Sequence, residues 1–408
     1  MTAVIRPHRL SGTVRAIPSK SAAHRALILA ALADKPCDIA ISSVSEDVMR
    51  TADALCEIGA GIVFAGDTVR VTPIQTTPQS AVIDCGESGS TLRFMMCVCA
   101  SLGISTEFIC RGRLGLRPMG ELRRVLEDHG IAFDGDHKIS GRLCAGEYSI
   151  AGNVSSQYVT GLMLALGALG EASFIRLTSP LESAPYVELT KKMMDDFGCR
   201  VVTDEGVVIP ASHYTSPEAY SVEGDWSAAS FRLCAGCTVD GLTPESAQGD
   251  RRITDILREM GAEVSVGQKS ASARFDSLHA ITLDARDIPD LVPVIAALCA
   301  TADGESRIRG VRRLKYKESD RIASVVDMIN ALGGDASATD DEIVIRGTVL
   351  RGGTVDGRGD HRIVMAAAVA SCFCTDRVSI SDAGSAAKSD PHFWEDFAAL
   401  GGEVSFIS

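Results

Sequence analysis

Amphipathic helical patterns that end at a glycine and lead into a short strand recur along this chain. In each, apolar residues at helical spacing are followed by a glycine and then by alternating apolar and polar residues. A glycine at a helix end supplies a left-handed turn that other residues adopt with difficulty. The pattern occurs six times, at 55–63, 125–133, 193–202, 256–266, 326–336 and 397–404, with the glycines Gly59, Gly130, Gly198, Gly261, Gly333 and Gly401.

The spacing of these glycines predicts an internal repeat. They lie about 68 residues apart, which is one sixth of the 408 residues. In the first copy the pattern predicts helices and strands in the order helix 22–33, strand 38–42, helix 47–58, strand 61–64 and strand 68–72. We therefore expect two helices and several strands per copy, three copies per domain and a domain boundary near 220–224.

Polar residues gather where each predicted apolar helix begins. Lys20 and Arg25 precede the wholly apolar run 26–33, which is typical of a buried helix. Both are therefore expected at the N-terminal end of that helix. A turn with glycines and hydroxyls, 86–93, precedes the run 94–100. The other helix starts are Arg117-Pro118 before 119–126, 155–157 before 158–169, Asp225 before 227–237, 289–290 before 291–300, 314–321 before 322–332, and 360–362 before 363–374. Pro118 is expected at the first helical position. Ser319 or Asp320 is expected to cap the helix 322–332.

Many of these entrances carry cations, although a helix N-terminus is itself the positive end of a dipole. That arrangement is sensible for binding small phosphorylated or carboxylated metabolites. The acids there, Glu318, Asp290 and Asp225, are few enough to be catalytic groups and not counterions. The cations are Lys20, Arg25, Arg93, Arg117, Lys317, Arg321 and Arg362.

The charge and composition of the chain limit the classes of function that we expect for it. A net charge of -13 opposes binding to nucleic acid and to anionic membranes, and the longest apolar run, 363–374, is too short to cross a bilayer. Residues 1–7 have no apolar signal core, so we expect a cytoplasmic protein whose 13 cysteines are reduced. Cys234-Ala-Gly-Cys237 is the one pair at metal-ligand spacing and is expected to pack in the core, so no metal is predicted.

Nine short motifs resemble the 5-enolpyruvylshikimate-3-phosphate synthase family, in the same order over essentially the whole chain. Single motifs of this kind are weak, whereas nine in register are specific. They are Ser19-Lys-Ser-x-x-x-Arg25, Gly86-x-x-Gly-x-x-x-Arg93, Arg117-Pro118, Ser155-Ser-Gln157, Val222-Glu-Gly-Asp225, Gln248-Gly-Asp250, Ile288-Pro-Asp290, Lys317-Glu-Ser-Asp-Arg321 and Asp360-His-Arg362.

The resemblance implies an α/β protein with two domains, an inside-out α/β barrel of six βαβαββ repeats with the active site in the interdomain cleft. It implies transfer of the enolpyruvyl group of phosphoenolpyruvate to the 5-hydroxyl of shikimate 3-phosphate by a monomer without a cofactor, in the pathway to chorismate and aromatic amino acids. We expect residues 19–224 to form the shikimate 3-phosphate domain, and 1–18 with 225–408 the phosphoenolpyruvate domain.

The resemblance also implies site residues. Asp290 is expected to face the reacting hydroxyl, Glu318 to carry the proton and Lys20 with Lys317 to stabilise charge. His361 is either catalytic or bonded to neighbouring backbone. The implied ligands of shikimate 3-phosphate are Lys20, Ser21, Arg25, Ser155, Ser156, Gln157, Ser183, Tyr186, Asp290 and Lys317. Those of phosphoenolpyruvate are Lys20, Gly89, Arg117, Gln157, Arg321, Arg362 and Lys388. The resemblance places the last of these lysines near Gly384, and Lys388 lies four residues after that position.

Two alternatives stay open at this point. A sister family transfers enolpyruvate to UDP-N-acetylglucosamine and carries a reactive cysteine in the loop before its Arg-Pro. Residues 111–116 contain no cysteine, and Cys110 lies too early. A metabolite-binding protein without catalysis could use the same scaffold, but Glu318 and Asp290 argue against it.

Overall fold

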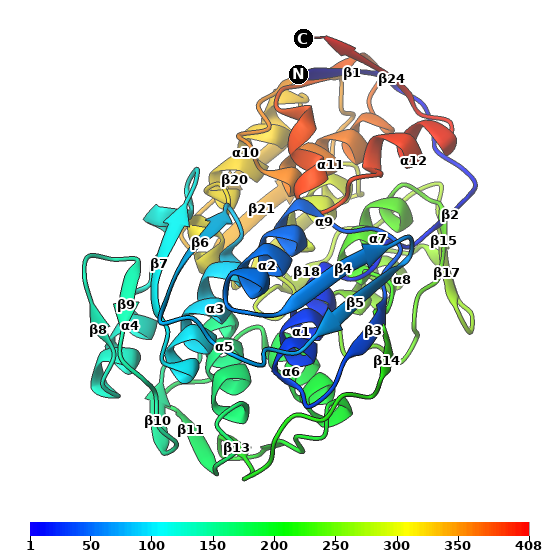
Figure 1. Ribbon diagram of the computed structural model, residues 1–408. Coiled ribbons are helices and arrows are strands. Elements are labelled where there is room, and N and C mark those ends of the chain that lie inside the picture. The colour runs from blue at the N-terminus through cyan, green and yellow to red at the C-terminus, as the bar shows by residue number, and fades with distance from the viewer. Residues whose placement is uncertain (408) are drawn as a thin grey trace. The chain divides into compact units, whose positions relative to one another are not determined.

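The computed structural model describes residues 1–407 and separates into two compact units (Figure 1). The continuous unit is Lys20–Val222. The discontinuous unit joins Met1–Ser19 to the chain from Glu223 onward.

Among residues 1–407 there are six four-stranded sheets of one topology, three in each unit. In every sheet the first and second strands are parallel, whereas the second and third strands, and the third and fourth strands, are antiparallel. The sheets of the continuous unit are β14 (Ala219–Ser221), β3 (Cys37–Ala40), β5 (Thr68–Thr72) and β4 (Gly61–Ala65); β6 (Ser80–Gly86), β7 (Ser105–Cys110), β9 (Lys138–Ser140) and β8 (Ala132–Phe133); β10 (Glu147–Ile150), β11 (Ser173–Leu177), β13 (Val207–Ile209) and β12 (Val202–Thr203). Those of the discontinuous unit are β2 (Thr13–Arg15), β15 (Thr238–Asp240), β17 (Ser270–Arg274) and β16 (Glu263–Val266); β18 (Thr282–Asp284), β19 (Glu305–Arg309), β21 (Glu342–Arg346) and β20 (Asp335–Ala338); β22 (Gly353–Val355), β23 (Val378–Ile380), β1 (Thr2–Arg6) and β24 (Glu403–Ile407).

The N-terminal segment belongs to the discontinuous unit because its strands complete two sheets there. Strand β1 lies between β23 and β24, and β2 pairs in parallel with β15. In the same way β14, late in the continuous unit, pairs with β3 to complete the sheet of the first copy. The pairing of β1 and β2 explains why the discontinuous unit is built from two segments of chain.

Each copy contains a buried first helix and an amphipathic second helix. The second helices expose one face and bury the other, as their apolar spacing requires. The first helices are α1 (Lys20–Leu32), α3 (Gly89–Leu102), α5 (Ser156–Gly167), α7 (Trp226–Cys234), α9 (Val292–Cys299) and α11 (His361–Ser371). The second helices are α2 (Glu46–Glu57), α4 (Gly120–Asp128), α6 (Ala184–Asp196), α8 (Ile253–Glu259), α10 (Arg321–Ala331) and α12 (Phe393–Ala399). Short 3-10 turns η1 (Leu114–Leu116), η2 (Gly249–Arg252), η3 (Arg312–Tyr316) and η4 (Ala383–Lys388) precede four of the second helices.

The first helices form the centre of each unit. In the continuous unit α3 packs on α5, and α1 packs on α2 and α6. In the discontinuous unit α11 packs on both α7 and α9. Every residue of α9 and α11 is buried, so the helix N-termini are the places where these central helices can present polar groups.

The predicted repeat and fold class are confirmed. All six repeat glycines have positive φ, between 81° and 106°, and each follows the second helix of its copy. Cys234 and Cys237 are buried in the core, as expected. Over residues 1–407 no helix combines the length and apolar character that crossing a membrane requires.

Two predicted helix starts are wrong. Helix α3 begins at Gly89, not at 94, because the Ser88 side chain caps it by accepting from the Thr91 N–H. Pro118 is not the first helical residue, since α4 begins at Gly120. The Pro118 carbonyl instead accepts a bond from the Tyr158 hydroxyl on α5, which holds it outside the helix.

Candidate active-site residues

Lys20 opens α1 and contacts an acid on the neighbouring helix. Its Nζ lies 2.9 Å from the Asp47 carboxylate in the first turn of α2, and both side chains are largely buried. The carboxylate fixes the direction of the lysine side chain. Ser21 follows in the same first turn, and its carbonyl accepts from Arg25.

Arg25 lies inside α1 and is almost completely buried. Its guanidinium donates to Thr190 Oγ1 at 2.8 Å, to Thr160 Oγ1 at 3.3 Å, to the Tyr186 carbonyl at 3.1 Å and to the Ser21 carbonyl at 2.6 Å. Within the described part of the chain these bonds use four of its five N–H groups, which leaves one for a ligand. Burial lowers the pKa of Arg25 to about 10, so it remains a cation at neutral pH.

Gly89 is enclosed by two arginines at the start of α3. A Cβ placed on Gly89 would lie 2.5 Å from Arg93 Nη1 and 2.9 Å from Arg117 Nη1. The absence of a side chain therefore lets both guanidinium groups approach the backbone N–H groups of the helix start. Such a combination of cations and free helix N–H groups suits a carboxylate or phosphate.

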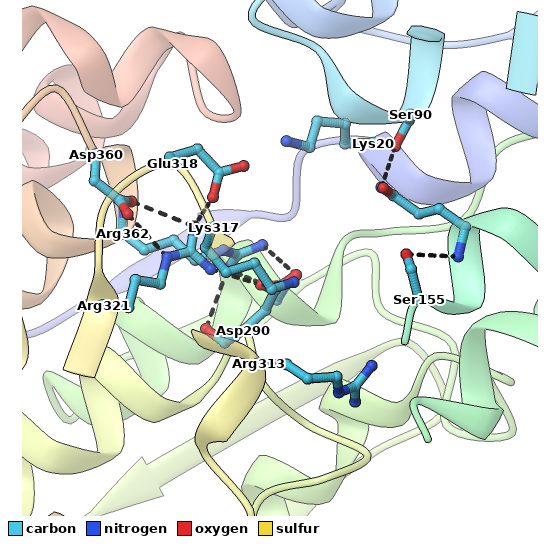
Figure 2. A network of polar contacts seen from close by, with 12 residues as sticks. Lys20, Ser90, Ser155, Asp290, Arg313, Lys317, Glu318, Arg321, Asp360 and Arg362 are labelled. Atoms are coloured by element: carbon cyan, nitrogen blue, oxygen red, sulfur yellow. Dashed lines mark hydrogen bonds and ion pairs between the residues drawn. The ribbon is translucent and has the colours of Figure 1, made fainter. Parts of the chain in front are cut away.

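Gln157 is held beside the same arginines. Its Oε1 accepts from Arg93 Nη1 at 2.6 Å, and its Nε2 donates to Ser90 Oγ at 3.0 Å. Ser155 caps α5 by accepting from the Gln157 N–H, and Figure 2 shows these short contacts around Ser90 and Ser155. Ser156, the first residue of α5, is buried.

Ser183 has a strained backbone at the start of α6. Its φ of 57° lies in the left-handed region, which a residue with a side chain adopts at a cost of about 1–3 kcal/mol. It is buried, and its helix also carries Tyr186, whose carbonyl accepts from Arg25. Strain of this kind tends to persist where a side chain must point at a ligand.

In the discontinuous unit Arg321 is the centre of a buried ion network (Figure 2). This first residue of α10 is 1% exposed. It donates to Asp360 Oδ2 at 2.9 Å, to Asp290 Oδ1 at 2.8 Å and to Glu318 Oε2 at 2.6 Å. Burial opposes the charge of Arg321, but the three carboxylates outweigh burial and raise its pKa above the usual value.

Asp290 is shared by three cations. Besides Arg321, its carboxylate lies 3.1 Å from Arg362 Nη2 and 3.6 Å from Lys317 Nζ. Burial alone would favour the protonated acid, yet these cations hold the pKa of Asp290 well below its usual range. Asp290 is therefore an anion that can accept a hydrogen bond from a substrate hydroxyl.

Asp360, His361 and Arg362 open α11. Asp360 caps the helix by accepting from the Arg362 N–H at 3.0 Å, and His361 beside it is buried. Arg362 Nη1 donates to Ser227 Oγ at 2.5 Å and to the Asp290 carbonyl at 3.3 Å. Lys388, at the end of η4, donates to the Gly359 carbonyl at 3.0 Å in the loop before this helix.

The expectation that Glu318, Asp290 and Asp225 are not counterions is wrong for the first two. Glu318 and Asp290 do act as counterions, because both pair with Arg321, and Asp225 caps α7 by accepting from the Ala228 N–H at 2.8 Å. The sequence argument counted acids and cations without their distances. The expected cap of α10 is Asp320, which accepts from the Ala323 N–H, whereas Ser319 donates to Asp360.

Comparisons with known proteins decide the family. The family model of EPSP synthase (3-phosphoshikimate 1-carboxyvinyltransferase) matches residues 4–397. A 3-phosphoshikimate 1-carboxyvinyltransferase of Brachyspira hyodysenteriae is 37% identical over 99% of this chain and 100% of the relative. One of Clostridium beijerinckii is 35% identical over 98% of this chain and 97% of the relative. The chain belongs to the EPSP synthase family.

Solved structures show the same fold. An EPSP synthase of Acinetobacter baumannii aligns with a TM-score of 0.80 at 22% identity, over 99% of this chain and 100% of that one. The enolpyruvyl transferase NikO of Streptomyces tendae aligns with a TM-score of 0.79 at 18% identity, over 99% and 98%. Because EPSP synthases share this fold with another enolpyruvyl transferase, the fold alone would not separate the two reactions.

Sequence reasoning missed the contacts that hold the EPSP synthase motifs in place. Asp47 fixes Lys20, the hydroxyls of Thr160 and Thr190 hold Arg25, and Asp360 binds Arg321. An acid in the first turn of the second helix could have indicated Asp47. The two threonines lie 135 and 165 residues from Arg25, so no local pattern indicates them.

Proposed function

We propose that this chain transfers the enolpyruvyl group of phosphoenolpyruvate to the 5-hydroxyl of shikimate 3-phosphate and releases phosphate. The observation that carries the proposal is the family match over residues 4–397. Cations at the starts of buried helices support it, since both substrates are anions. In this role it is a 3-phosphoshikimate 1-carboxyvinyltransferase (EC 2.5.1.19) of the route to chorismate and aromatic amino acids.

The reaction consists of an addition followed by an elimination. The 5-hydroxyl oxygen bonds to C2 of phosphoenolpyruvate, the hydroxyl proton leaves the oxygen, and a proton is added to the C3 methylene. The tetrahedral ketal phosphate then loses phosphate from C2 and a proton from C3, which restores the enol double bond. Catalysis needs a proton carrier near C3, an acceptor near the hydroxyl and cations around the phosphate.

Asp290 and Glu318 are suited to different parts of this sequence. Asp290, held ionised by three cations, accepts a hydrogen bond from the 5-hydroxyl and orients it. Glu318 carries the proton for C3, with its direction fixed by the 2.6 Å bond to Arg321. Lys20 and Lys317 stabilise the charge that develops on the phosphate, and His361 is a further candidate for proton transfer.

The ligand sets implied by the sequence are part of this proposal. Arg25, Ser21, Ser155, Ser156, Gln157, Ser183 and Tyr186 bind shikimate 3-phosphate together with Lys20, Asp290 and Lys317. Lys20, Gly89, Arg117, Gln157, Arg321, Arg362 and Lys388 bind phosphoenolpyruvate. We further propose a cytoplasmic monomer that needs no cofactor, and light scattering after gel filtration tests the monomer.

Phosphate release tests the proposed reaction. We expect release from phosphoenolpyruvate with shikimate 3-phosphate as acceptor and none with UDP-N-acetylglucosamine. Lys20→Met should lower turnover by at least about 100-fold, the usual scale for removing a charge-stabilising or proton-transferring group. Lys35→Met is the matched control, because exposed Lys35 pairs with Glu218 on the same unit. Binding of both substrates without phosphate release would favour a non-catalytic binding protein.

A further inference from the structure

His24 is a buried histidine to which the mechanism above gives no role. It lies in α1, between Lys20 and Arg25 in the sequence, and is 1% exposed. Its Nδ1 lies 2.7 Å from Thr51 Oγ1 on α2, and its ring stands at 88° to that of Phe94 on α3. Burying a polar ring among three helices costs free energy unless hydrogen bonds offset it, so the bonds of His24 indicate its role.

A continuous chain of buried hydrogen bonds leads from His24 to the start of α3. Thr51 Oγ1 lies 2.8 Å from Thr91 Oγ1, and Thr91 Oγ1 lies 2.8 Å from Ser88 Oγ. The Thr91 N–H also donates to Ser88 Oγ, at 3.2 Å, and this bond caps α3. The four residues are at most 1% exposed. The chain therefore connects α1, α2 and the N-terminal end of α3 inside the continuous unit.

The Asp47 carbonyl fixes the direction of these bonds. It lies 3.4 Å from Thr91 Oγ1, and a carbonyl can only accept, so the single hydroxyl hydrogen of Thr91 points toward Asp47 and Ser88. Thr91 Oγ1 then accepts from the Thr51 hydroxyl, and Thr51 Oγ1 accepts from His24 Nδ1. His24 is therefore a donor at Nδ1.

The other ring nitrogen indicates that His24 is neutral. Its Nε2 is buried and has no hydrogen-bond partner among residues 1–407. A second N–H there would be an unsatisfied donor on a buried charge, whereas a neutral ring leaves one lone pair without a partner. Burial, then the cations Lys20 and Arg25, lower the pKa of His24 well below its ordinary value, in agreement with this geometry.

The chain of bonds joins two helix starts that carry candidate ligands of phosphoenolpyruvate. Helix α1 opens with Lys20, whose partner is the Asp47 carboxylate in the first turn of α2. The Asp47 carbonyl accepts from Thr91, two residues after Gly89, the first residue of α3. Asp47 thus contacts Lys20 through its side chain and α3 through its backbone. Because α2 packs on both α1 and α3, a shift of α3 against α2 would change the distance between Gly89 and Lys20.

We propose that His24 is a positioning residue for phosphoenolpyruvate: through the hydroxyls of Thr51 and Thr91 it fixes the start of α3 relative to Lys20. The inference rests on the proposed function for the identity of the anion. It assigns to His24 no contact with substrate. Shikimate 3-phosphate should be less affected, because the bonds that hold Arg25 lie outside this chain of hydroxyls.

Two substitutions of His24 separate positioning from packing. Asparagine places an amide donor where Nδ1 stands but leaves a void in place of the rest of the ring, whereas leucine fills the space and donates nothing. Positioning predicts that His24→Leu raises KM for phosphoenolpyruvate by about tenfold, the scale for losing one buried hydrogen bond, and that His24→Asn restores most of the affinity. A role in packing alone predicts the opposite order. KM for shikimate 3-phosphate should change little in either variant.

Removing the hydroxyls tests the chain of bonds itself. Thr51→Val and Thr91→Val keep the shape of the side chain, and each should raise KM for phosphoenolpyruvate by about tenfold. His24→Leu combined with Thr51→Val should be little worse than Thr51→Val alone, because both interrupt the same chain. Thr106→Val is the matched control, since Thr106 is also buried in the continuous unit but its hydroxyl donates to the Ile104 carbonyl at 3.0 Å.

The hydrogen on Nδ1 can be observed directly. Nitrogen-15 NMR of the histidine side chains, assigned with His24→Asn, should show His24 near neutral pH as an uncharged ring with its hydrogen on Nδ1. A hydrogen on Nε2, or a charged ring, contradicts the donor role.

Other outcomes overturn the inference as well. A wild-type KM for phosphoenolpyruvate in Thr51→Val and Thr91→Val excludes positioning, and so does an equal rise in the KM values of both substrates. Should His24→Leu fail to fold, the two valine variants test the same chain of bonds.

The failure of the proposed function would look different. An absence of phosphate release in the wild-type chain contradicts that function, and calorimetric binding of phosphoenolpyruvate in the presence of shikimate 3-phosphate then tests His24 in the same variants. Weaker binding in His24→Leu than in His24→Asn supports positioning, and equal binding overturns it. A wild-type chain that binds no phosphoenolpyruvate overturns both proposals.

Discussion

The guanidinium of Arg321 donates from Nε to Asp360 Oδ2 at 2.9 Å, and both side chains are buried. Arg321 opens α10 and Asp360 caps α11, so this pair joins the second helix of one copy to the first helix of the next. Asp360 also accepts from the Ser319 hydroxyl at 2.9 Å. The Asp360 carboxylate therefore holds Arg321, which is a candidate ligand of phosphoenolpyruvate, as well as the start of α11 and the loop before α10.

Asp360→Asn should lower the free energy of unfolding by about 1–3 kcal/mol, because it weakens several bonds to a charged group at once. Arg321 keeps Glu318 and Asp290, so the loss stays below that of a fully orphaned buried charge. Chemical denaturation at pH 7 measures the change. Asp335→Asn is the control, since exposed Asp335 pairs with Arg346 on the surface and should change stability by less than about 0.5 kcal/mol. Equal losses in the two variants would contradict the buried role of Asp360.

Acid should destabilise the fold through the same network. Burial opposes the ionisation of Asp290 and Asp360, but Arg362, Lys317 and Arg321 lower the pKa of Asp290, and Arg321 lowers that of Asp360. A carboxyl whose pKa is lower in the folded state stabilises the fold above its unfolded value, about 3.9, and loses that contribution as the pH falls through the folded value. The free energy of unfolding should therefore decrease at pH values below about 4. The difference between wild type and Asp360→Asn should shrink there, and a difference independent of pH would contradict the linkage.

The repeat could be predicted from the sequence because its signals are local. A glycine after each second helix and the switch from helical to alternating spacing lie within about ten residues of one another. The starts of several helices could be predicted for the same reason, since Asp225, Asp320 and Asp360 cap the helices that follow them. Propensity and capping do not depend on the rest of the fold.

The groups that hold the site depend on contacts between distant segments. Asp360 lies 39 residues from Arg321, and Thr190 lies 165 residues from Arg25. The enclosure of Gly89 has the same kind of cause, because Arg117, which lies beside it, comes from another segment. Patterns along the chain identify which residues are polar at a helix start but not which partner each one meets.

Gly89→Ala should weaken phosphoenolpyruvate binding. A Cβ there would approach the guanidinium nitrogens of Arg93 and Arg117 to 2.5 and 2.9 Å, so both arginines would have to move. We expect KM for phosphoenolpyruvate to rise by about tenfold or more, the scale of one lost charge-assisted hydrogen bond, with a smaller change for shikimate 3-phosphate. Gly120→Ala at the start of α4 is the matched control, because a Cβ there meets nothing within 4 Å. Unchanged kinetics in Gly89→Ala would show that the arginines adapt without cost.

Thiol reagents should not inactivate the enzyme in a way that substrate prevents. Burial raises the pKa of Cys110 to about 11, so little of the reactive thiolate is present at neutral pH. Cys110 ends β7, and residues 111–116 contain no cysteine. Activity after iodoacetamide, with and without substrates, is the measurement, together with phosphate release with UDP-N-acetylglucosamine. Substrate-protected alkylation of Cys110 with loss of activity would overturn the reaction proposed above.

Glu318→Gln should separate binding from turnover. In the wild type Glu318 Oε2 accepts from Arg321 at 2.6 Å, and a glutamine oxygen can accept the same bond. Arg321 is also held by Asp290 and Asp360, so the loss of one carboxylate charge should leave it in place. What glutamine cannot do is exchange a proton with C3 of the substrate.

We therefore expect the dissociation constant for shikimate 3-phosphate to change little while kcat falls by about 10²–10⁴-fold, the usual scale for losing a general acid or base. Glu342→Gln is the matched control, because Glu342 on β21 also pairs with arginines, Arg307 and Arg309, but has no proposed role in the site. Both constants should be measured on the same preparation, since a purely structural Glu318 would lower the melting temperature or the affinity and leave kcat nearly intact. A normal kcat in Glu318→Gln would exclude Glu318 as the proton carrier. That role would then be assigned to Lys20 or His361.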